Sequence, residues 1–426
     1  MEPDQHGRAI AELLTEGVGR RTLLRAVAGL SSAGAAGLAL PSAAEASDGH
    51  GRDEPVRVLQ PGTGRIRGTY VATSPSTVSW GKLPNRNTEP VAVVPSGAVV
   101  TFDTLSHEGV LEDQGRDPRG YFGGFGVRAS QVLRDAVQIA ASATHDGPGP
   151  HVVTGPVAVR GAQPGDVLKV EVLDLKLRVP YGVISNRHGK GALPGELPEA
   201  WDDEPQYRRY YNPGGNISVF TPVRTGSGGL RGRLPGVRRG FPLNPFMGLM
   251  GVARDTSALV DSVPPTVTGG NLDINDLGVG STLWLPVQVA GARFFTGDPH
   301  MAQGDGEVAL TALEGSLRAT FRLSVVKPGG KAPSVAFAGY AFGETARHWL
   351  PIGLSDPDGP VAGQVTSLDA AMKAAVRNAM AFLTEDLGLD GPVAYAYLSA
   401  AADFQVSQVV DRTTGVHALV RKADFR

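Results

Sequence analysis

The densest group of chemically capable side chains lies at residues 296–307, which read Thr-Gly-Asp-Pro-His-Met-Ala-Gln-Gly-Asp-Gly-Glu. In an extended chain alternate side chains share a face, so Asp298 would lie beside His300 and Asp305 beside Glu307. Carboxylates combined with an imidazole suit zinc or another divalent cation. The same residues fit a Gly/Asp hairpin turn in which His300 only forms a hydrogen bond. The segment therefore indicates either a metal or acid–base site or an ordinary turn.

Three shorter segments carry similar groups, and each also fits an ordinary turn or surface loop. Oxygen-bearing side chains after two glycines can bind a ligand or form Asx turns. Paired histidines around a Pro/Gly loop can bind a metal, act as a general base or face water. The residues are Asn271 and Asp273, His145 and His151, and Asp103, His107 and Glu108.

Composition indicates the class of fold that positions these residues. The chain has 426 residues, including 57 Gly and 32 Pro, which favours a turn-rich, mainly β fold over a helical bundle. Cysteine is absent, which excludes disulfides and catalytic thiols. A net charge of only -2 argues against nucleic acid as the main partner. The common nucleotide-binding loops are also missing from the sequence.

The N-terminal segment predicts an export signal. Arg20 and Arg21 precede a weakly apolar stretch at 26–40, and Ala44-x-Ala46 fits a cleavage site. Residues 1–46 are therefore expected to be a twin-arginine signal peptide, with the mature protein periplasmic or extracellular and not stably inserted in a membrane. The alternative is an N-terminal tethering helix.

Residues 47–426 are expected to form one compact domain. Alternating polar and apolar residues predict strands at 92–102, 168–177, 281–289 and 317–325, and the second of these changes parity as a β-bulge would. Apolar residues at helical spacing predict a helix at 367–387, and further helices are expected at 392–402 and 130–141. The prediction is a large β-sandwich or barrel-like core at 55–350 with a C-terminal helical layer at 366–402.

Ordered motifs continue along this domain. The three most specific are Gly269-Gly270-Asn271-Leu272-Asp273, Gly280-Ser281-Thr282-Leu283-Trp284-Leu285-Pro286-Val287 and Gly297-Asp298-x-His300-x-x-Gln303-Gly304-Asp305-Gly306-Glu307-Val308. With others at 149–157, 161–168, 245–253 and 399–417, they resemble the acetamidase/formamidase family over nearly all of the chain beyond the signal. Two positions depart from the family pattern, because Thr268 stands where a histidine is expected and Arg254 where a proline is expected.

The resemblance implies a hydrolase that cleaves small linear amides to a carboxylic acid and ammonia with metal or carboxylate assistance. Our hypothesis is that a divalent metal, zinc or else calcium, activates water, with Glu307 as the general acid and base. The assigned residues are Asp298, His300, His151, Asp103 and His107 for the metal, Glu307, Asp305 and His300 for catalysis, and Asn271, Asp273, Gln303 and Gly304 for substrate.

Other functions stay open at this point. The substrate could be a cyclic amide, a carbamate or a larger amide, and the chain could instead be a secreted binding module with a structural ion. The expected partner is a small-molecule amide. A homo-oligomer is compatible with the sequence.

Overall fold

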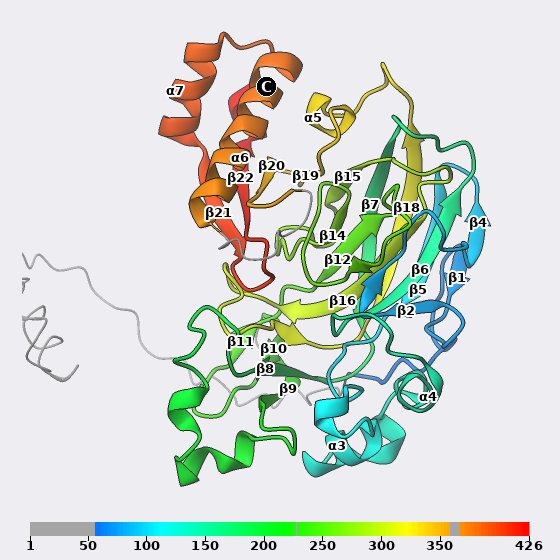
Figure 1. The fold of residues 1–426 in the computed structure, drawn as a ribbon, viewed down its shortest axis with the longest axis vertical. Coiled ribbons are helices and arrows are strands. Elements are labelled where there is room, and N and C mark those ends of the chain that lie inside the picture. Colours follow the sequence, from blue (N-terminus) through cyan, green and yellow to red (C-terminus); the bar gives the residue numbers. More distant parts are fainter. Residues whose placement is uncertain (1–55, 227, 358–366, 426) are drawn as a thin grey trace, which may run out of the picture. The chain divides into compact units, whose positions relative to one another are not determined.

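The computed structural model describes residues 56–226, 228–357 and 367–425. The predicted signal peptide at 1–46 lies outside these residues. Two large β-sheets dominate the fold (Figure 1). In the described part of the chain, no helix combines the length and the apolar character needed to cross a bilayer.

The nine-stranded sheet is almost entirely antiparallel. Its order is β1 (Thr69–Val71), β5 (Ala98–Asp103), β18 (Leu317–Val326), β7 (Val167–Leu177), β15 (Thr282–Pro286), β19 (Phe342–Glu344), β20 (His348–Leu354), β22 (Gly415–Arg421) and β21 (Asp403–Gln408). The exception is the parallel pair formed by β1 and β5.

The eleven-stranded sheet carries most of the site. Its main path is β11 (Phe241–Pro242), β10 (Gly229–Gly232), β9 (Ile217–Gly226), β8 (Tyr181–Asn186), β17 (Leu313–Glu314), β16 (Phe294–Ala302), β12 (Phe246–Val252) and β14 (Gly269–Asn271). A branch adds β6 (Val152–Val159) to β16, with β2 (Val78–Trp80) and β4 (Ala92–Val94) paired to β6. A separate small sheet pairs β3 (Lys82–Leu83) with β13 (Val260–Asp261).

The two sheets pack face to face through a shared apolar core. Phe102 of β5 and Phe321 of β18 come from the nine-stranded sheet, and Phe294 of β16 comes from the other. The ring of Phe294 lies edge-on to both, with centroid distances of 5.8 Å to Phe102 and 5.3 Å to Phe321. This packing buries the inward faces of both sheets and confirms the mainly β, sandwich-like prediction.

The predicted strands are mostly in place. In the pairing of β7 with β18, Thr320 lies opposite Asp174 and Phe321 opposite Val172, so Leu173 is the extra residue of a bulge. This is the predicted change of parity. The expected strand at 92–102 is divided into β4 and β5 because Pro95 and Gly97, with φ 84°, form a turn between them. The strand expected at 281–289 is shortened to β15.

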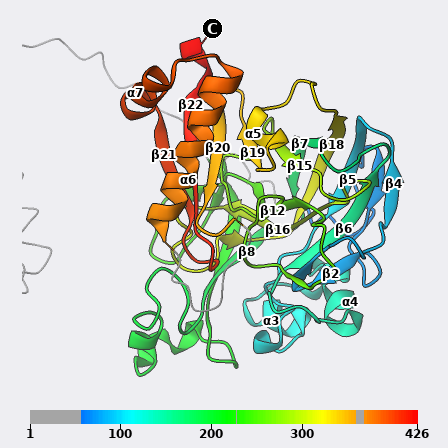
Figure 2. The same cartoon turned by 45° about the horizontal axis from the view of Figure 1, so that its top comes forward.

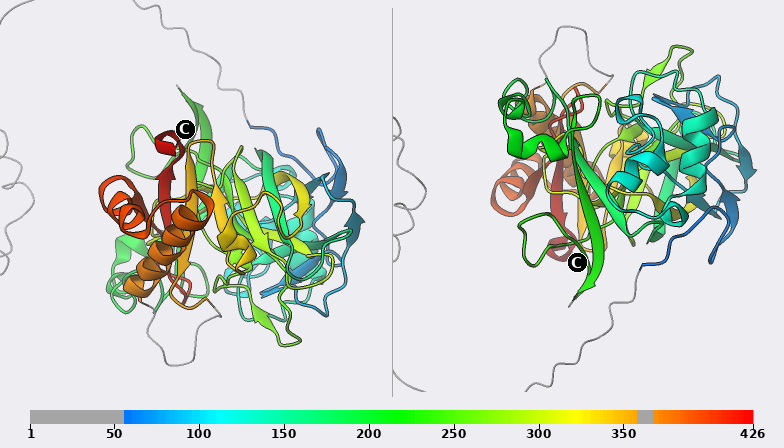
Figure 3. Two further views of the ribbon diagram at one scale, coloured as in Figure 1. Left: turned by 90° about the horizontal axis from the view of Figure 1, so that it is seen from above. Right: turned by 90° about the horizontal axis from the view of Figure 1, so that it is seen from below.

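The helices cover two ends of the molecule. At one end lie α5 (Ser334–Phe337), α6 (Leu368–Ala381), a π-helical turn (Phe382–Asp386) and α7 (Gly391–Ala401); at the other lie α3 (Pro118–Gly124) and α4 (Arg134–Ser142) (Figures 1 and 3). Short 3₁₀ turns occur at Glu112–Gln114, Ala129–Gln131, Glu199–Trp201, Pro205–Tyr210 and Lys422–Phe425. The helix expected at 130–141 begins only at Arg134, because a 3₁₀ turn precedes it.

The predicted helix at 367–387 is present as α6 and the π-helical turn, and Leu383, one of the apolar residues at helical spacing, is fully buried. Ala371, Ala375 and Ala379 are buried, whereas Leu368 is 41% exposed. The helix lies across β20 and β22 (Figure 2). A Cβ on Gly353 of β20 would collide with the backbone of Ala375, so only small side chains fit between helix and sheet.

Candidate active site

Seven titratable side chains from distant parts of the chain meet inside the sandwich, and we call them the acid–histidine cluster. All of them are buried. They are supplied by β16 and β17, by the segments that follow β5 and β14, by the residue before β6 and by the loop after β16. The residues are His107, His151, Asp273, Asp298, His300, Glu307 and Glu314.

Strand pairing explains how the centre of the cluster forms. Asp298 and His300 are alternate residues of β16, and His300 lies directly opposite Glu314 of β17. His300 Nε2 is 2.9 Å from Asp298 Oδ2 and 3.0 Å from Glu314 Oε1. On the other side of β16, Gly248 of β12 lies beside these residues. A Cβ there would collide with Asp273 and press against His300 and Asp298, so glycine leaves room for the cluster.

Two further histidines lie close to Asp298. His107 Nδ1 lies 3.5 Å from Asp298 Oδ1, and His151 Nε2 lies 3.7 Å from Asp298 Oδ2. The second nitrogen of His151 is 2.9 Å from the Ser262 hydroxyl. The second nitrogen of His107 is 3.4 Å from a carboxylate oxygen of Glu108. Asp298 is therefore shared by three imidazoles, each of which is supported on its outer edge.

Gln303 provides that support for His300. Its Nε2 donates to the backbone carbonyls of Asp273 (2.9 Å) and Ser407 (3.1 Å), so its Oε1 must face His300 Nδ1, at 3.0 Å. An amide oxygen can only accept, which places the proton of a neutral His300 on Nδ1. The lone pair of Nε2 then faces two carboxylates, Asp298 and Glu314, an arrangement that a cation between them would stabilise.

Burial and crowding perturb the titration of the whole cluster. Burial raises the pKa of Glu314 to about 7, with the charge of Asp298 acting in the same direction. Burial also raises the pKa of Asp273 and of Glu307 well above their ordinary values. It lowers the pKa of His151 to about 4 and keeps that ring neutral. Five interacting groups in one water-poor site are typical of a functional site rather than of a folding core.

The imidazoles of His107 and His300 respond differently. Burial opposes their protonation, but the nearby carboxylates of Asp298 and Glu108 raise the pKa of His107 to about 10. The charges of Glu314 and Asp298 likewise overcome burial and raise the pKa of His300 well above its usual value. In the metal-free protein these raised pKa values favour protonated side chains, which reduce the repulsion among the buried carboxylates. A divalent cation would displace those protons.

Orphaned polar atoms support a cation at this position. Among the described residues, buried atoms without a hydrogen-bond partner include His107 Nδ1 and Nε2, Asp298 Oδ1, His300 Nε2, Glu314 Oε2 and both carboxylate oxygens of Asp273. Such atoms are costly unless an unseen ligand satisfies them. Three sets have ligand atoms within 4.8 Å of one another: His107, His151 and Asp298; Asp298, His300 and Glu314; and Asp273, His300 and Glu307. The residues present therefore fit a metal.

The cluster opens into a cavity of about 840 Å³. Asn271, Glu307 and Asp411 reach its wall together with Asp298 and Glu314 of the cluster. Burial raises the pKa of Asp411 to about 7. Solvent and a small molecule can therefore reach the carboxylates, which a purely structural ion site would not require.

Besides Asp103, three of the expected residues lie neither in the acid–histidine cluster nor on the cavity wall. Asp305 and Gly304 are exposed, and Asp305 accepts a hydrogen bond of 2.9 Å from Asn275 instead of entering the cavity. Gln303, expected to bind substrate, does not line the cavity and instead positions His300. The other expected residues, Asn271 and Asp273 included, lie in the cluster or on the cavity wall, except Asp103.

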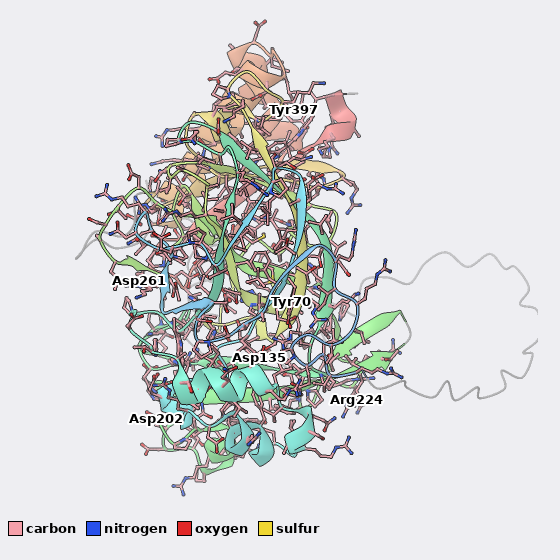
Figure 4. All side chains as sticks on the ribbon, turned by 90° about the vertical axis from the view of Figure 1, so that its right-hand side faces the viewer. Tyr70, Asp135, Asp202, Arg224, Asp261 and Tyr397 are labelled. Carbon is pink, nitrogen blue, oxygen red and sulfur yellow. The ribbon has the colours of Figure 1, made fainter. Side chains whose placement is uncertain are left out.

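Asp103 belongs to a separate buried ion network. Its carboxylate accepts hydrogen bonds from Arg318 at 2.6 and 2.9 Å and from the Tyr70 hydroxyl at 2.6 Å. Arg178 bridges this carboxylate to Asp135, at 2.7 Å (Tyr70 and Asp135 are labelled in Figure 4). Both oxygens are occupied by cationic or hydroxyl donors, so the structure places Asp103 outside the candidate metal site, contrary to the sequence-based expectation.

Glu314 is the main residue that sequence reasoning missed. It lies in a two-residue strand and belongs to no recognisable motif, and only its pairing with His300 reveals it. Asp411 was visible only within the C-terminal family motif. Thr268, one of the two departures from the family pattern, is buried with its hydroxyl 3.1 Å from that of Thr266. Neither Thr268 nor Arg254 reaches the cavity wall.

Comparisons with known proteins identify the family of the chain. A model of the acetamidase/formamidase family matches residues 143–262 and 257–420. A formamidase from Methylophilus methylotrophus is 28% identical over 306 residues, which cover 61% of this chain and 73% of that protein. An acetamidase from Mycolicibacterium smegmatis is 30% identical over 202 residues, which cover 37% of this chain and 49% of that protein.

Two solved structures share the fold. An acetamidase from Bacillus halodurans has a TM-score of 0.60 at 24% identity, with 84% of this chain and 98% of that chain covered. An acetamidase from Yersinia enterocolitica has a TM-score of 0.62 at 21% identity, with coverages of 86% and 96%. The predicted enzyme class, a hydrolase of carbon–nitrogen bonds other than peptide bonds, is confirmed with the fold. The chain belongs to the acetamidase/formamidase family.

Proposed function

We propose that this protein hydrolyses small linear amides of the formamide and acetamide type to a carboxylic acid and ammonia, with a divalent cation in the acid–histidine cluster. The observation that carries the proposal is the convergence of Asp298, His300 and Glu314, of which Asp298 and Glu314 line the cavity, with buried polar atoms that have no hydrogen-bond partner among the described residues. Membership of the family supports the class of reaction.

The cation would be held by Asp298 with His300 and Glu314, or by Asp298 with His107 and His151. Mixed nitrogen and oxygen ligands suit zinc or a similar transition metal, whereas calcium takes oxygen ligands almost exclusively. Zinc is therefore preferred to calcium. When bound, such an ion lowers the pKa of water and polarises a carbonyl group.

Glu307 is the proposed general acid and base. Its carboxyl group is buried, faces the cavity and lies 3.9 Å from His300 Nε2. Burial raises its pKa well above the ordinary value, which favours the protonated form and suits a group that gives a proton to the leaving nitrogen. An amide nitrogen leaves only after protonation, so this role is required by the chemistry.

Asn271 is the proposed group that orients the substrate. It lies on the cavity wall beside the cluster, and its side-chain oxygen has no hydrogen-bond partner among the described residues. A carboxamide can both donate to a substrate carbonyl and accept from an amide nitrogen. Asn271 was among the residues assigned to substrate from the sequence, whereas Gly304, assigned with it, is exposed.

We further propose that residues 1–46 direct export by the twin-arginine route, so that the mature enzyme acts in the periplasm or outside the cell. The support is Arg20-Arg21 with the cleavage pattern Ala44-x-Ala46. Replacing Arg20 and Arg21 with lysine should retain the protein inside the cell. Export of that variant at the normal rate would contradict the assignment.

The test is ammonia release by the chain from Ser47 onward, with formamide, acetamide and propionamide, before and after chelation and metal add-back. Turnover should be lost on chelation and restored by one metal. Glu307→Gln should be inactive but retain metal, whereas His300→Ala should lose metal. An active Glu307→Gln variant, or turnover that is indifferent to chelation, would refute the mechanism.

The volume of the cavity favours a second candidate within the same chemistry, the hydrolysis of a larger amide. Cavities of about 300–1,000 Å³ hold drug-sized ligands, and this one measures about 840 Å³. Water occupies about 30 Å³ in the liquid, so formamide and acetamide, with three and four non-hydrogen atoms, would fill only a small part of this volume. Longer primary amides should therefore be included in the assay.

A further inference from the structure

We propose that the cavity accepts a primary amide that carries a carboxylate at the end remote from the reacting carbon, and that Lys190 and Arg187 at the cavity wall recognise this carboxylate. The inference rests on the proposed function and names its substrate class. In the reaction one amide and one water molecule give a second carboxylate and ammonium: the C–N bond breaks, a C–O bond forms, and nitrogen leaves with the proton.

The cavity has two chemically different parts. The acid–histidine cluster supplies one part, where a carboxylate on the substrate would be repelled. Apolar side chains form much of the remaining wall, namely Leu111, Pro148, Val263, Leu310, Val409 and Val410. Basic groups from two loops, Arg187, Lys190 and Arg412, also line it, beside the carboxylates of Glu112, Asp113 and Asp411. Asp113 is paired with Arg187, whereas no described acid pairs with Lys190, so a ligand with a neutral amide, a short apolar chain and an anionic end fits this wall.

Arg187 supplies the first unsatisfied donor. Its Nε lies 3.1 Å from Asp113 Oδ2, and its Nη1 donates to the Ser185 hydroxyl at 3.3 Å. Its Nη2 is buried without a partner among the described residues, and only 13% of the side chain is exposed. A guanidinium group can donate two parallel hydrogen bonds to a carboxylate, and Nη2 of Arg187 is the donor that no described residue occupies.

Lys190 supplies the second donor. The neighbouring cations are neutralised, since Arg187 pairs with Asp113 and Arg412 with Asp261. Lys190 forms no ion pair with any described residue. Burial, followed by the charges of Arg187 and Arg412, lowers its pKa, while Asp113 and Asp261 act in the opposite direction without fully offsetting the repulsion among the three cations. An anion bound between them would relieve that repulsion.

The loop that carries Lys190 is anchored independently of any ligand. Lys190 N donates to the Arg187 carbonyl at 3.1 Å, and Gly189 N donates to Glu199 Oε1 at 2.6 Å. His188 in the same turn lies 2.8 Å from Asp202 (labelled in Figure 4). The backbone is therefore held while the Lys190 side chain stays available at the cavity.

The experiment compares succinamate with its methyl ester, which has almost the same shape but no charge. Wild-type, metal-loaded enzyme should show a kcat/KM for succinamate that exceeds that for the ester by about tenfold or more, since charge-assisted hydrogen bonds are the strong ones. In Lys190→Gln this ratio should fall about tenfold, mainly through KM. In the control Lys331→Gln, an exposed lysine away from the cavity, the ratio should stay the same.

Equal use of acid and ester by the wild type, or equal ratios in the Lys190→Gln and Lys331→Gln variants, would overturn the proposal. Calorimetry with succinamate on the inactive Glu307→Gln enzyme, alone and combined with Lys190→Gln or Lys331→Gln, tests recognition without turnover. Binding that weakens about tenfold in Lys190→Gln and not in Lys331→Gln would support it, and absence of binding would overturn it. Failure of the proposed function is seen separately, as no ammonia release from any amide, charged or neutral.

Discussion

Replacing Gln303 with methionine should weaken metal binding through a residue that touches neither metal nor substrate. Methionine has a similar length but cannot reproduce the three hydrogen bonds of the amide, to His300 Nδ1 at 3.0 Å and to two carbonyls at 2.9 and 3.1 Å. His300 would then be free to rotate or to change tautomer. Outer-shell substitutions of this kind typically reduce metal affinity by about 10–100-fold.

The loss of stability can be estimated from the same bonds. Each unsatisfied buried group costs about 1–3 kcal/mol, and Gln303 is only partly buried, so water can replace some partners. At the low end, three groups cost about 3 kcal/mol. Urea unfolding of the metal-free protein measures this cost, and competition with a chelator measures zinc affinity.

Gln405→Met is the matched control. Gln405 Oε1 lies 3.2 Å from Nε2 of His417, a buried histidine outside the cluster, so the substitution removes a comparable support. It should reduce stability without changing zinc affinity. If Gln303→Met binds zinc as tightly as the wild type, the strand alone orients His300 and the argument from the tautomer is incorrect.

Two further predictions concern the cluster. Gly248→Ala should abolish metal binding, because its Cβ would collide with Asp273 and press on His300 and Asp298; metal content of the purified variant checks this, and full occupancy would contradict it. Melting of the chelated protein should change with pH. Since the folded-state pKa of Glu314 is raised from 4.5 to about 7, its stabilising contribution is complete below pH 4.5 and is lost as pH rises through 7. The raised pKa of Asp411, about 7, also makes the folded protein less stable as pH rises. The pKa of His151 is lowered to about 4, which has the opposite effect on stability, and the two carboxyl groups together should outweigh it. The melting temperature of chelated protein should therefore fall between pH 4.5 and 7 while stabilisation by metal grows; a melting temperature that rises in this window would contradict the reasoning.

The sequence by itself determined what depends on local order. Alternation along 317–325 and the parity change at 168–177 predicted β18 and the bulge in β7, because side chains alternate across a strand whatever its partner is. The helix at 367–387 was also predictable. Its buried face was not, because a glycine on β20 decides how closely the helix approaches and so selects alanine over the larger residues.

Some residues of the candidate site were likewise predictable from local sequence, and others only from the tertiary structure. Asp298 and His300 were predicted as a pair, since two residues on one strand face share a direction in any fold. Glu314 and Gln303 depended on tertiary structure, because their roles arise from strand register and from hydrogen bonds to carbonyls distant in sequence. Asp103 shows the reverse case: its type suits a metal, but packing gave it Arg318 as a partner. Residue type limits what a side chain can do, and only the three-dimensional neighbours of that side chain determine which of those roles it has.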